Sequence, residues 1–371
     1  MSPLPFDHQP RTRLVYGNGT LARAGELARE LGTRALVVSD PGIVKTGHVV
    51  RALSFLAEAG LQARVFGEVR ENPSTEDVDA CVAVAREFQA DLIIGLGGGS
   101  SMDTAKGCNF ILTNGGRMQD YWGVGKATKP MLPLIAIPTT AGTGSECQSF
   151  ALISDPETHV KMACGDPKAA AKAAILDPEL SLSQPQRVTV CTGIDALSHA
   201  LETAVTKKRS ALSSLYSREA FRLCHSGFSR VLRDPKDLDA RGMMLLGAAC
   251  SGIAIENSML GVAHSCANPL TAKFNVVHGE AVGVMLPHAI RFNSQMPEIA
   301  AIYESYFDGD LADRVSELLW EAQMPRHIAE HGVKEEHLGD LAAMAARQWT
   351  AQFNPRPAAV DDFVALYRAA L

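Results

Sequence analysis

Four side chains in the C-terminal half of the chain are of the types that bind one divalent metal ion. They are Asp195, His199, His264 and His278. Asp195 and His199 lie four residues apart, so on a helix their side chains project from one face about one turn apart. A carboxylate oxygen and neutral imidazole nitrogens suit Fe²⁺, Zn²⁺ or Mn²⁺. Three histidines and one aspartate leave a coordination position for a substrate oxygen, which a catalytic metal site requires.

The Asp195–His199 pair is weak evidence by itself. Helices often carry an aspartate and a histidine at this spacing, on the surface or in the core, without binding any ligand. For a single pair, a structural role is therefore more common than metal binding. The prediction of a catalytic site therefore depends on a cofactor-binding sequence elsewhere in the chain.

A glycine-rich loop follows the strand predicted at Asp91–Ile94 and opens a helix. Its members are Gly97, Gly98, Gly99 and Ser100. Glycines let the backbone approach a phosphate closely, and a helix N-terminus offers free N–H groups and the positive end of a dipole. The loop therefore predicts a pyrophosphate site. Taken by itself, however, the run of glycines is explained equally well by a strand-to-helix turn that binds no ligand. It does not match the G-x-G-x-x-G fingerprint.

A second polar cluster comes directly after the strand predicted at Leu134–Ile137. Its hydroxyl side chains are Thr139, Thr140, Thr143 and Ser145. Together with two glycines they form a donor-rich turn suited to nicotinamide, ribose or phosphate oxygens. Helix capping by Thr140 or Thr143 is the alternative, but capping does not explain why hydroxyls gather where doubly wound sheets bind ligands.

An acidic residue, Asp40, follows the strand predicted at Arg34–Val38. A carboxylate at the C-terminal end of a strand can accept hydrogen bonds from an adenosine ribose and repel a 2′-phosphate. By itself, Asp40 is more simply interpreted as a turn residue before Pro41.

The elements that must position these residues alternate between strands and helices in the first half of the chain. Such alternation indicates βαβ units and a largely parallel sheet covered by helices. Besides the strands named above, the pattern predicts a strand at Gln62–Phe66 and a hairpin at Ala151–Ala163 that turns at Asp155-Pro156. The predicted helices are Ile43–Ala59, Thr75–Gln89 and Ser100–Leu112.

The character of the sequence changes near residue 185, after which the β signal fades and helical spacing continues to Leu371. We therefore expect two domains, an α/β domain over residues 1–185 and an all-helical domain over residues 186–371. No internal repeat or low-complexity tract interrupts either half.

Composition excludes several classes of protein. A hydrophobic content of 46% is typical of a globular protein with a sizeable core. The formal net charge is −6, so we expect no nucleic-acid or anionic-membrane partner. The N-terminal residues contain no apolar segment typical of a secretory signal. No stretch approaches 18 uncharged apolar residues, and Met243–Ile255 is interpreted as a buried helix. Eight cysteines without a C-x-x-C pair favour a reducing, cytoplasmic location.

Taken together, these motifs resemble the iron-containing (group III) alcohol dehydrogenase family. The resemblance extends from about Tyr16 to Asn293, and several motifs occur in the family's order and spacing. The matching segments are Gly97–Lys106, Ile137–Glu146, Lys161-Met162, Asp177–Leu180, Gly193–Glu202, His264, Val277–Glu280 and Leu286–His288.

The resemblance implies an N-terminal dinucleotide-binding α/β domain and an all-α C-terminal domain, the dehydroquinate synthase-like architecture of the family. It places the metal ligands on the four residues named first, with Fe²⁺ favoured and Zn²⁺ possible. It adds cofactor contacts at Asn72, Lys161 and Leu180, and implies that Asp40 makes the enzyme prefer NAD over NADP. It further implies a homodimer or larger homo-oligomer.

The implied activity is an NAD-dependent, metal-dependent interconversion of a small alcohol and its aldehyde or ketone. Two other functions remain open: a hydroxyacid–oxoacid transhydrogenase of the same family, and a catalytically inactive protein that binds metal and NAD. A lyase similar to dehydroquinate synthase ranks low, because no cluster of basic residues stands beside the ligand motifs, although Lys273 is near them.

One departure from the family pattern concerns proton transfer. Many members read H-x-x-x-H-P at the third ligand, whereas here Asn268 and Pro269 follow His264. Asn268 is four residues after His264 and should share its helix face. An amide can orient a substrate but does not titrate near neutral pH, so the proton would have to leave by another route.

Overall fold

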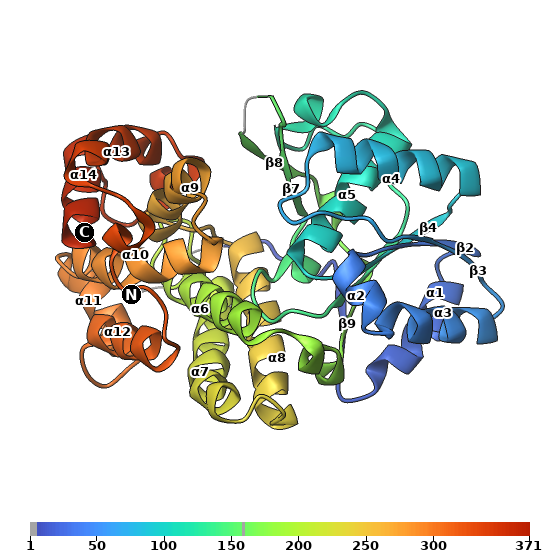
Figure 1. The fold of residues 1–371 in the computed structure, drawn as a ribbon, viewed down its shortest axis with the longest axis horizontal. Coiled ribbons are helices and arrows are strands. Elements are labelled where there is room, and N and C mark those ends of the chain that lie inside the picture. The colour runs from blue at the N-terminus through green and yellow to red at the C-terminus, as the bar shows by residue number, and fades with distance from the viewer. Residues whose placement is uncertain (1–5, 158–159) are drawn as a thin grey trace. The chain divides into compact units, whose positions relative to one another are not determined.

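The computed structural model describes residues 6–157 and 160–371, and the chain divides into two compact units. One unit is helical and consists of Pro185–Leu371, the short segment Ala141–Thr143 and the described residues up to His8. The other contains Gln9–Thr140 and Gly144–Gln184 and is built on a β-sheet (Figure 1).

The sheet of the α/β unit has six strands in the order β1-β9-β6-β4-β2-β3, and every pair is parallel. The predicted parallel sheet is thus confirmed. The strands are β1 Arg13–Tyr16, β2 Arg34–Val38, β3 Gln62–Phe66, β4 Leu92–Gly97, β6 Leu134–Pro138 and β9 Ala173–Leu176.

Helices cover both faces of this sheet (Figure 1). Successive side chains of a strand point to opposite faces, so Ile93 packs in one core and Ile94 in the other. The helices α4 Thr75–Phe88 and α5 Gly99–Asn114 contribute to the core of Ile93, and α1 Ala24–Arg29 and α3 His48–Glu58 to the core of Ile94.

The predicted single helix Ile43–Ala59 is wrong in one respect. The segment forms two helices, α2 Pro41–Lys45 and α3, separated at Gly47. Gly47 has φ 85°, a left-handed conformation that favours glycine and ends a helix. Strands β1 and β9 were not predicted.

A second, three-stranded sheet has the order β5-β8-β7. Its strands β7 Phe150–Ser154 and β8 Lys161–Gly165 are antiparallel, which confirms the predicted hairpin, and β5 is Gly123–Val124. Two residues of the predicted hairpin, Thr158 and His159, lie outside the described residues. Short 3₁₀ helices complete the unit: η1 Thr20–Arg23, η2 Met118–Tyr121, η3 Ser145–Cys147, η4 Pro167–Ala169 and η5 Pro178–Ser183.

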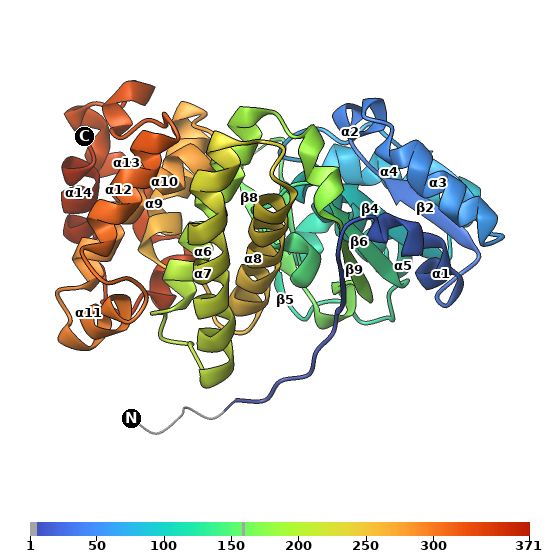
Figure 2. The same cartoon turned by 90° about the horizontal axis from the view of Figure 1, so that it is seen from below.

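The second unit contains only helices among its described residues, as predicted. Helices α6, α7 and α8 pack side by side (Figure 2). The α-helices are α6 Gln186–Thr203, α7 Ala211–Arg233, α8 Leu238–Glu256, α9 Val262–Phe274, α10 His278–Asn293, α11 Pro297–Glu304, α12 Leu311–Glu321, α13 Leu338–Ala346 and α14 Val360–Ala369. The 3₁₀ helices are η6 Ile328–His331, η7 Glu335–His337 and η8 Trp349–Phe353.

Helix α8 is long and apolar enough to cross a membrane by length and composition alone. However, 72% of its most apolar window is buried inside the protein, as in the core helix of a globular unit. It includes Met243–Ile255, the segment that the sequence predicted to be a buried helix.

Candidate functional site

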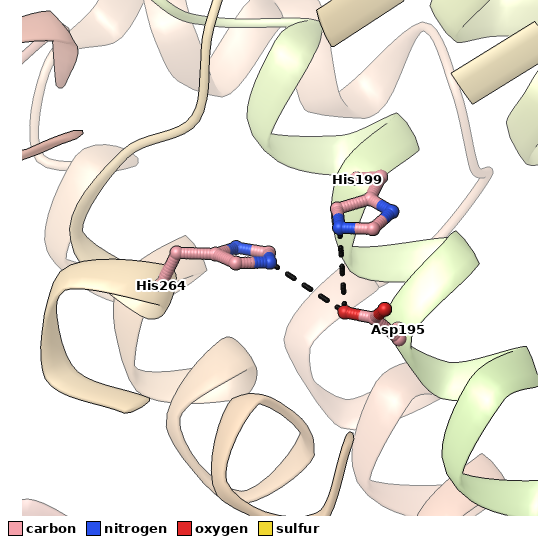
Figure 3. Close-up of side chains that lie close together, drawn as sticks. All are labelled: Asp195, His199 and His264. Atoms are coloured by element: carbon pink, nitrogen blue, oxygen red, sulfur yellow. Dashed lines mark ion pairs between the residues drawn. The ribbon is translucent and has the colours of Figure 1, made fainter. Parts of the chain in front are cut away.

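Helix α6 places Asp195 and His199 on one face, as their spacing predicts. The Nε2 atom of His199 lies 3.3 Å from Oδ1 of Asp195, and both residues are buried (Figure 3). One turn of helix therefore presents a carboxylate oxygen and an imidazole nitrogen at the same point.

Helix α9 brings a second histidine to the same oxygen. The Nε2 atom of His264 lies 3.5 Å from Oδ1 of Asp195, and the rings of His264 and His199 stack at 4.9 Å (Figure 3). Possible ligand atoms of the three residues all lie within 4.8 Å of one another, as the donors of one metal ion do.

His278, the first residue of α10, also approaches this cluster. Its Nε2 atom lies 3.8 Å from Oδ1 of Asp195, and its ring centre lies 5.4 Å from that of His264. The side chain is 36% exposed, unlike those of the three buried residues. The three predicted histidine ligands, which come from three different helices, thus converge on one carboxylate oxygen of the fourth predicted ligand, Asp195.

The donor atoms of this cluster fit a cation. Within the part of the chain that the structure describes, Oδ1 of Asp195 and Nε2 of His264 are buried and have no hydrogen-bond partner. Buried polar atoms are almost always satisfied, and a bound metal ion satisfies a carboxylate oxygen and an imidazole nitrogen together.

The charge state of Asp195 suits a metal ligand. Burial alone would raise the pKa of its carboxyl group, but His199, His264 and His278 hold that pKa well below its usual range. Burial lowers the pKa of His199. Burial also acts to lower the pKa of His264, but Asp195 and Glu202 outweigh it and raise that pKa to about 9. The cluster is therefore built around a carboxylate anion at neutral pH.

Glu202 holds His264 in position from behind. Its Oε2 accepts a hydrogen bond from Nδ1 of His264 at 2.6 Å, and its Oε1 accepts one from the backbone N–H of Ala263 at 2.7 Å. Donation from Nδ1 leaves Nε2 as the nitrogen that can bind a metal once the ring is neutral. Glu202 was not assigned this role from the sequence. Its spacing from Asp195 and His199, which places it on their helix face, was the missed signal.

The glycine-rich loop ends β4 and begins α5. Gly97 has φ 152°, and an added Cβ atom would lie 2.3 Å from Oγ of Ser101. Gly98 is the N-cap of α5, and its Cβ atom would lie 3.3 Å from Thr140. Gly99 and Ser100 form the first turn of the helix, where backbone N–H groups are free of intrahelical partners. This is the local geometry of an anion site.

The hydroxyl cluster lies beside this loop. The backbone N–H of Thr139 donates to the carbonyl of Gly97 at 2.9 Å, and the Oγ1 atom of Thr139 is buried without a partner among the described residues. Ser145 instead uses its hydroxyl inside the protein, as described below. Thr143 belongs to the short segment that groups with the helical unit.

The other predicted cofactor residues lie in separate parts of the α/β unit. Asp40 caps α2, its Oδ1 accepting from the N–H of Ile43 at 3.0 Å, while its Oδ2 accepts from Ser101 at 3.4 Å. Lys161 donates to the side chain of Asn72 at 3.3 Å, which joins two residues far apart in sequence. Leu180 is fully buried in the core of the unit. These cofactor contacts stay predictions.

A buried lysine ties the hydroxyl cluster to α5. Lys106 is fully buried, and its Nζ donates to the carbonyl and hydroxyl of Ser145 at 2.6 and 2.9 Å and to the carbonyl of Phe150 at 3.0 Å. The Ser145 hydroxyl donates in turn to Asp103 at 3.0 Å. Burial raises the pKa of Asp103 to about 6, although Lys106 and Lys161 oppose the rise. The sequence interpretation did not assign roles to Lys106 or Asp103.

Asn268, the residue that departs from the family pattern, is held by a second amide. Its Nδ2 donates to Oε1 of Gln348 at 3.0 Å, and both side chains are half-buried. Sequence reasoning missed Gln348, because nothing in its surroundings marks an amide 80 residues away as a partner.

Comparison with known proteins covers both units. The family model for iron-containing alcohol dehydrogenase matches residues 10–178, and the model for the C-terminal part of that family matches residues 189–371. The NAD-dependent methanol dehydrogenase of Bacillus methanolicus is 34% identical over 96% of this chain and 97% of its own.

Solved structures agree with these matches. A 1,3-propanediol oxidoreductase has a TM-score of 0.95 and 31% identity, covering 99% of this chain and 100% of its own. The sulfoacetaldehyde reductase of Bifidobacterium kashiwanohense in complex with NAD⁺ has a TM-score of 0.89 and 26% identity, covering 99% of each chain. The fold and the family thus agree over the whole length of the chain.

We predict that Glu202→Gln weakens metal binding about 10- to 100-fold, the usual effect of losing an outer partner of a metal ligand. Glutamine has one acceptor oxygen where Glu202 uses two, so it cannot accept from both Nδ1 of His264 and the N–H of Ala263, and the orientation of His264 is weakened. Competition with a chromophoric chelator for Zn²⁺ measures the affinity. Glu146→Gln, which changes a buried glutamate of the α/β unit, is the control and should have no effect. A change of less than about threefold in Glu202→Gln would contradict the role of Glu202.

We predict that Lys106→Met lowers the free energy of unfolding by about 3–5 kcal/mol, because it leaves Asp103 without its neighbouring cation and two buried carbonyls without their donor. Urea unfolding followed by circular dichroism measures the loss. Lys273→Met removes a lysine whose ion pair with Asp340 is largely exposed and should change stability by less than about 1 kcal/mol. If the two variants were equally stable, the buried network would not support the fold.

Proposed function

The chain belongs to the iron-containing alcohol dehydrogenase family, and on that premise we propose that it interconverts a small alcohol and its aldehyde or ketone with NAD. Membership makes it an oxidoreductase of the alcohol dehydrogenase class. The observation that carries the proposal is the convergence of His199, His264 and His278 on Oδ1 of Asp195. That oxygen and Nε2 of His264 are both buried without a hydrogen-bond partner among the described residues.

The proposed metal site consists of Asp195, His199, His264 and His278, with Fe²⁺ as the favoured ion and Zn²⁺ as a possible one. When bound, the metal supplies a Lewis acid for the substrate oxygen. The protein keeps the site largely dry, because three of the four side chains are buried, and a dry site strengthens each electrostatic interaction within it. Glu202 keeps His264 in the orientation that the site requires.

The proposed dinucleotide site is the loop of Gly97, Gly98, Gly99 and Ser100 at the start of α5. The free N–H groups of that helix end suit a pyrophosphate. NAD supplies the hydride acceptor. The hydroxyl of Thr139, which is buried without a partner in the described part of the chain, supports a hydrogen bond to the cofactor from the neighbouring loop. The half-buried carboxylate of Asp40 supports NAD over NADP. In this proposal residues 1–185 bind the cofactor and residues 186–371 bind the metal.

Oxidation of an alcohol also releases a proton from its hydroxyl group. Asn268 does not titrate, so we assign it an orienting role and not that of an acid or base. The Nδ2 atom of Asn268 donates to Oε1 of Gln348, and this bond holds the Asn268 amide in place. The oxygen of the Asn268 amide then serves as an acceptor for a substrate hydroxyl. The proton then leaves through water or a ribose hydroxyl.

The proposal is tested by NADH formation from a panel of small alcohols that includes methanol and 1,3-propanediol. Anaerobically purified protein is stripped of metal and reloaded with Fe²⁺ or Zn²⁺ separately. We expect no NADH from the stripped protein and recovery after reloading. Protein that binds metal and NADH but oxidises no alcohol would contradict a dehydrogenase. Hydride exchange between a hydroxyacid and an oxoacid on retained nucleotide would then identify a transhydrogenase, and its absence an inactive binder.

We predict that Asp40→Asn lowers the preference for NAD over NADP about tenfold or more, since it removes a charge that repels the 2′-phosphate. Asparagine caps a helix as well as aspartate does, so α2 should remain intact. The ratio of kcat/KM for the two nucleotides measures the change. An unchanged ratio, with folding preserved, would show that Asp40 is a capping residue only.

A further inference from the structure

The segment Asn354-Pro355-Arg356 follows η8, and its first residue lies 76 residues along the chain from His278, the proposed metal ligand nearest to it in sequence. Asn354 is only 1% exposed, and its amide makes four hydrogen bonds within the helical unit. A buried amide with every donor and acceptor used holds the groups around it in one arrangement.

One set of its contacts fixes the start of α9. Oδ1 of Asn354 accepts from the backbone N–H of Val262 at 3.3 Å, and Glu202 accepts from the next N–H, that of Ala263. These are groups that a helix leaves without intrahelical partners at its N-terminus, and the N-cap, Gly261, has no side chain to satisfy them. His264 is the following residue, so its backbone is held at the point where the helix begins.

Another set of contacts fixes the end of α10, the helix that begins with His278. Asn354 and Asn293 exchange two hydrogen bonds, of 2.7 and 3.2 Å. Arg356 donates to the carbonyl of Phe292 at 3.2 Å, and its guanidinium lies 3.8 Å from the centre of the Phe292 ring. The segment therefore binds the two helices that carry His264 and His278.

Gly261 shows how closely these groups approach the helix that carries the remaining ligands. A Cβ atom at Gly261 would lie 2.7 Å from Oδ1 of Asn354 and 3.0 Å from Oε1 of Glu202 on α6. Both side chains lie against the same glycine, so Asn354, α9 and α6 share one polar contact region. A second bond, between the hydroxyls of Ser265 and Thr350 at 2.7 Å, holds η8 against α9.

We propose that Asn354 is a positioning residue of the metal centre: by binding the start of α9 and the end of α10, it sets how His264 and His278 approach Asp195. The inference rests on the proposed metal site and adds a residue that touches none of the ligands. It differs from a purely structural role, in which losing the amide lowers stability and leaves the geometry of the folded site unchanged.

The test uses Asn354→Ala and Co²⁺ as the probe, because bound Co²⁺ reports its coordination in its visible absorption spectrum. Metal-free protein is titrated with Co²⁺ well below the unfolding temperature of each variant, and affinity is measured by chelator competition. We expect Asn354→Ala to bind Co²⁺ about tenfold more weakly, at the lower end of the effect of outer partners, with an altered spectrum.

Asn109→Ala is the matched control. Asn109 is a fully buried amide of α5 in the α/β unit, where it exchanges two hydrogen bonds with the backbone of Leu132. Its loss should lower the Tm of the protein but leave Co²⁺ affinity and spectrum as in the wild type. If Asn354→Ala does not fold, Arg356→Gln removes the contacts to Phe292 together with a 3.8 Å ion pair to Asp362, and we expect a smaller loss of affinity, about threefold.

An Asn354→Ala protein with wild-type Co²⁺ affinity and spectrum, but a lower Tm, would overturn the inference. So would wild-type binding in Arg356→Gln if that variant has to be used. Failure of the proposed metal site gives a different result, since the wild-type protein itself would then bind no Co²⁺, or would bind it equally well after Asp195→Ala.

Discussion

The helical unit depends on one buried negative charge. Asp195 is 4% exposed, and the removal of an unpaired carboxylate from water costs several kcal/mol. The chain offsets this cost by directing three imidazoles from three helices at a single oxygen of Asp195. A second buried carboxylate, Glu202, orients one of those imidazoles. Oδ1 of Asp195 and Nε2 of His264 are buried without a hydrogen-bond partner among the described residues, and we propose that a divalent cation binds them.

The α/β unit also contains a buried charged side chain, that of Lys106. Lys106 is a fully buried cation whose three hydrogen bonds join the hydroxyl cluster to the helix that begins at the glycine-rich loop. The loop and the hydroxyl cluster follow neighbouring parallel strands, β4 and β6, so their ends meet at one edge of the sheet. The buried lysine keeps the second loop in a fixed place relative to α5. In both units a buried charge determines where the polar groups of the site can lie.

Much of this could be predicted from the sequence, and the exceptions have physical reasons. Strands β2 and β3 have the predicted bounds, because β2 is a short, largely buried apolar run and β3 alternates polar with apolar residues, and both patterns indicate strands. The break at Gly47 was missed because the apolar pattern continues across it. The four residues proposed as ligands were predicted from the Asp195–His199 spacing and from the family resemblance, and the fold brings them together. The role of Glu202 was missed although its spacing places it on the helix face of Asp195 and His199. Asn354 carries no such signal, because its partners meet it only when the chain folds back on itself.

The central claim is that Asp195 and three histidines form one metal centre. X-ray absorption spectroscopy of the Zn²⁺-loaded protein, with metal analysis on the same sample, tests it directly. We expect one zinc ion per chain, with nitrogen and oxygen ligands at about 2.0–2.1 Å and no sulfur. We expect no bound zinc after Asp195→Ala. Sulfur ligands at about 2.3 Å, or zinc that persists in Asp195→Ala with an unchanged spectrum, would contradict the claim.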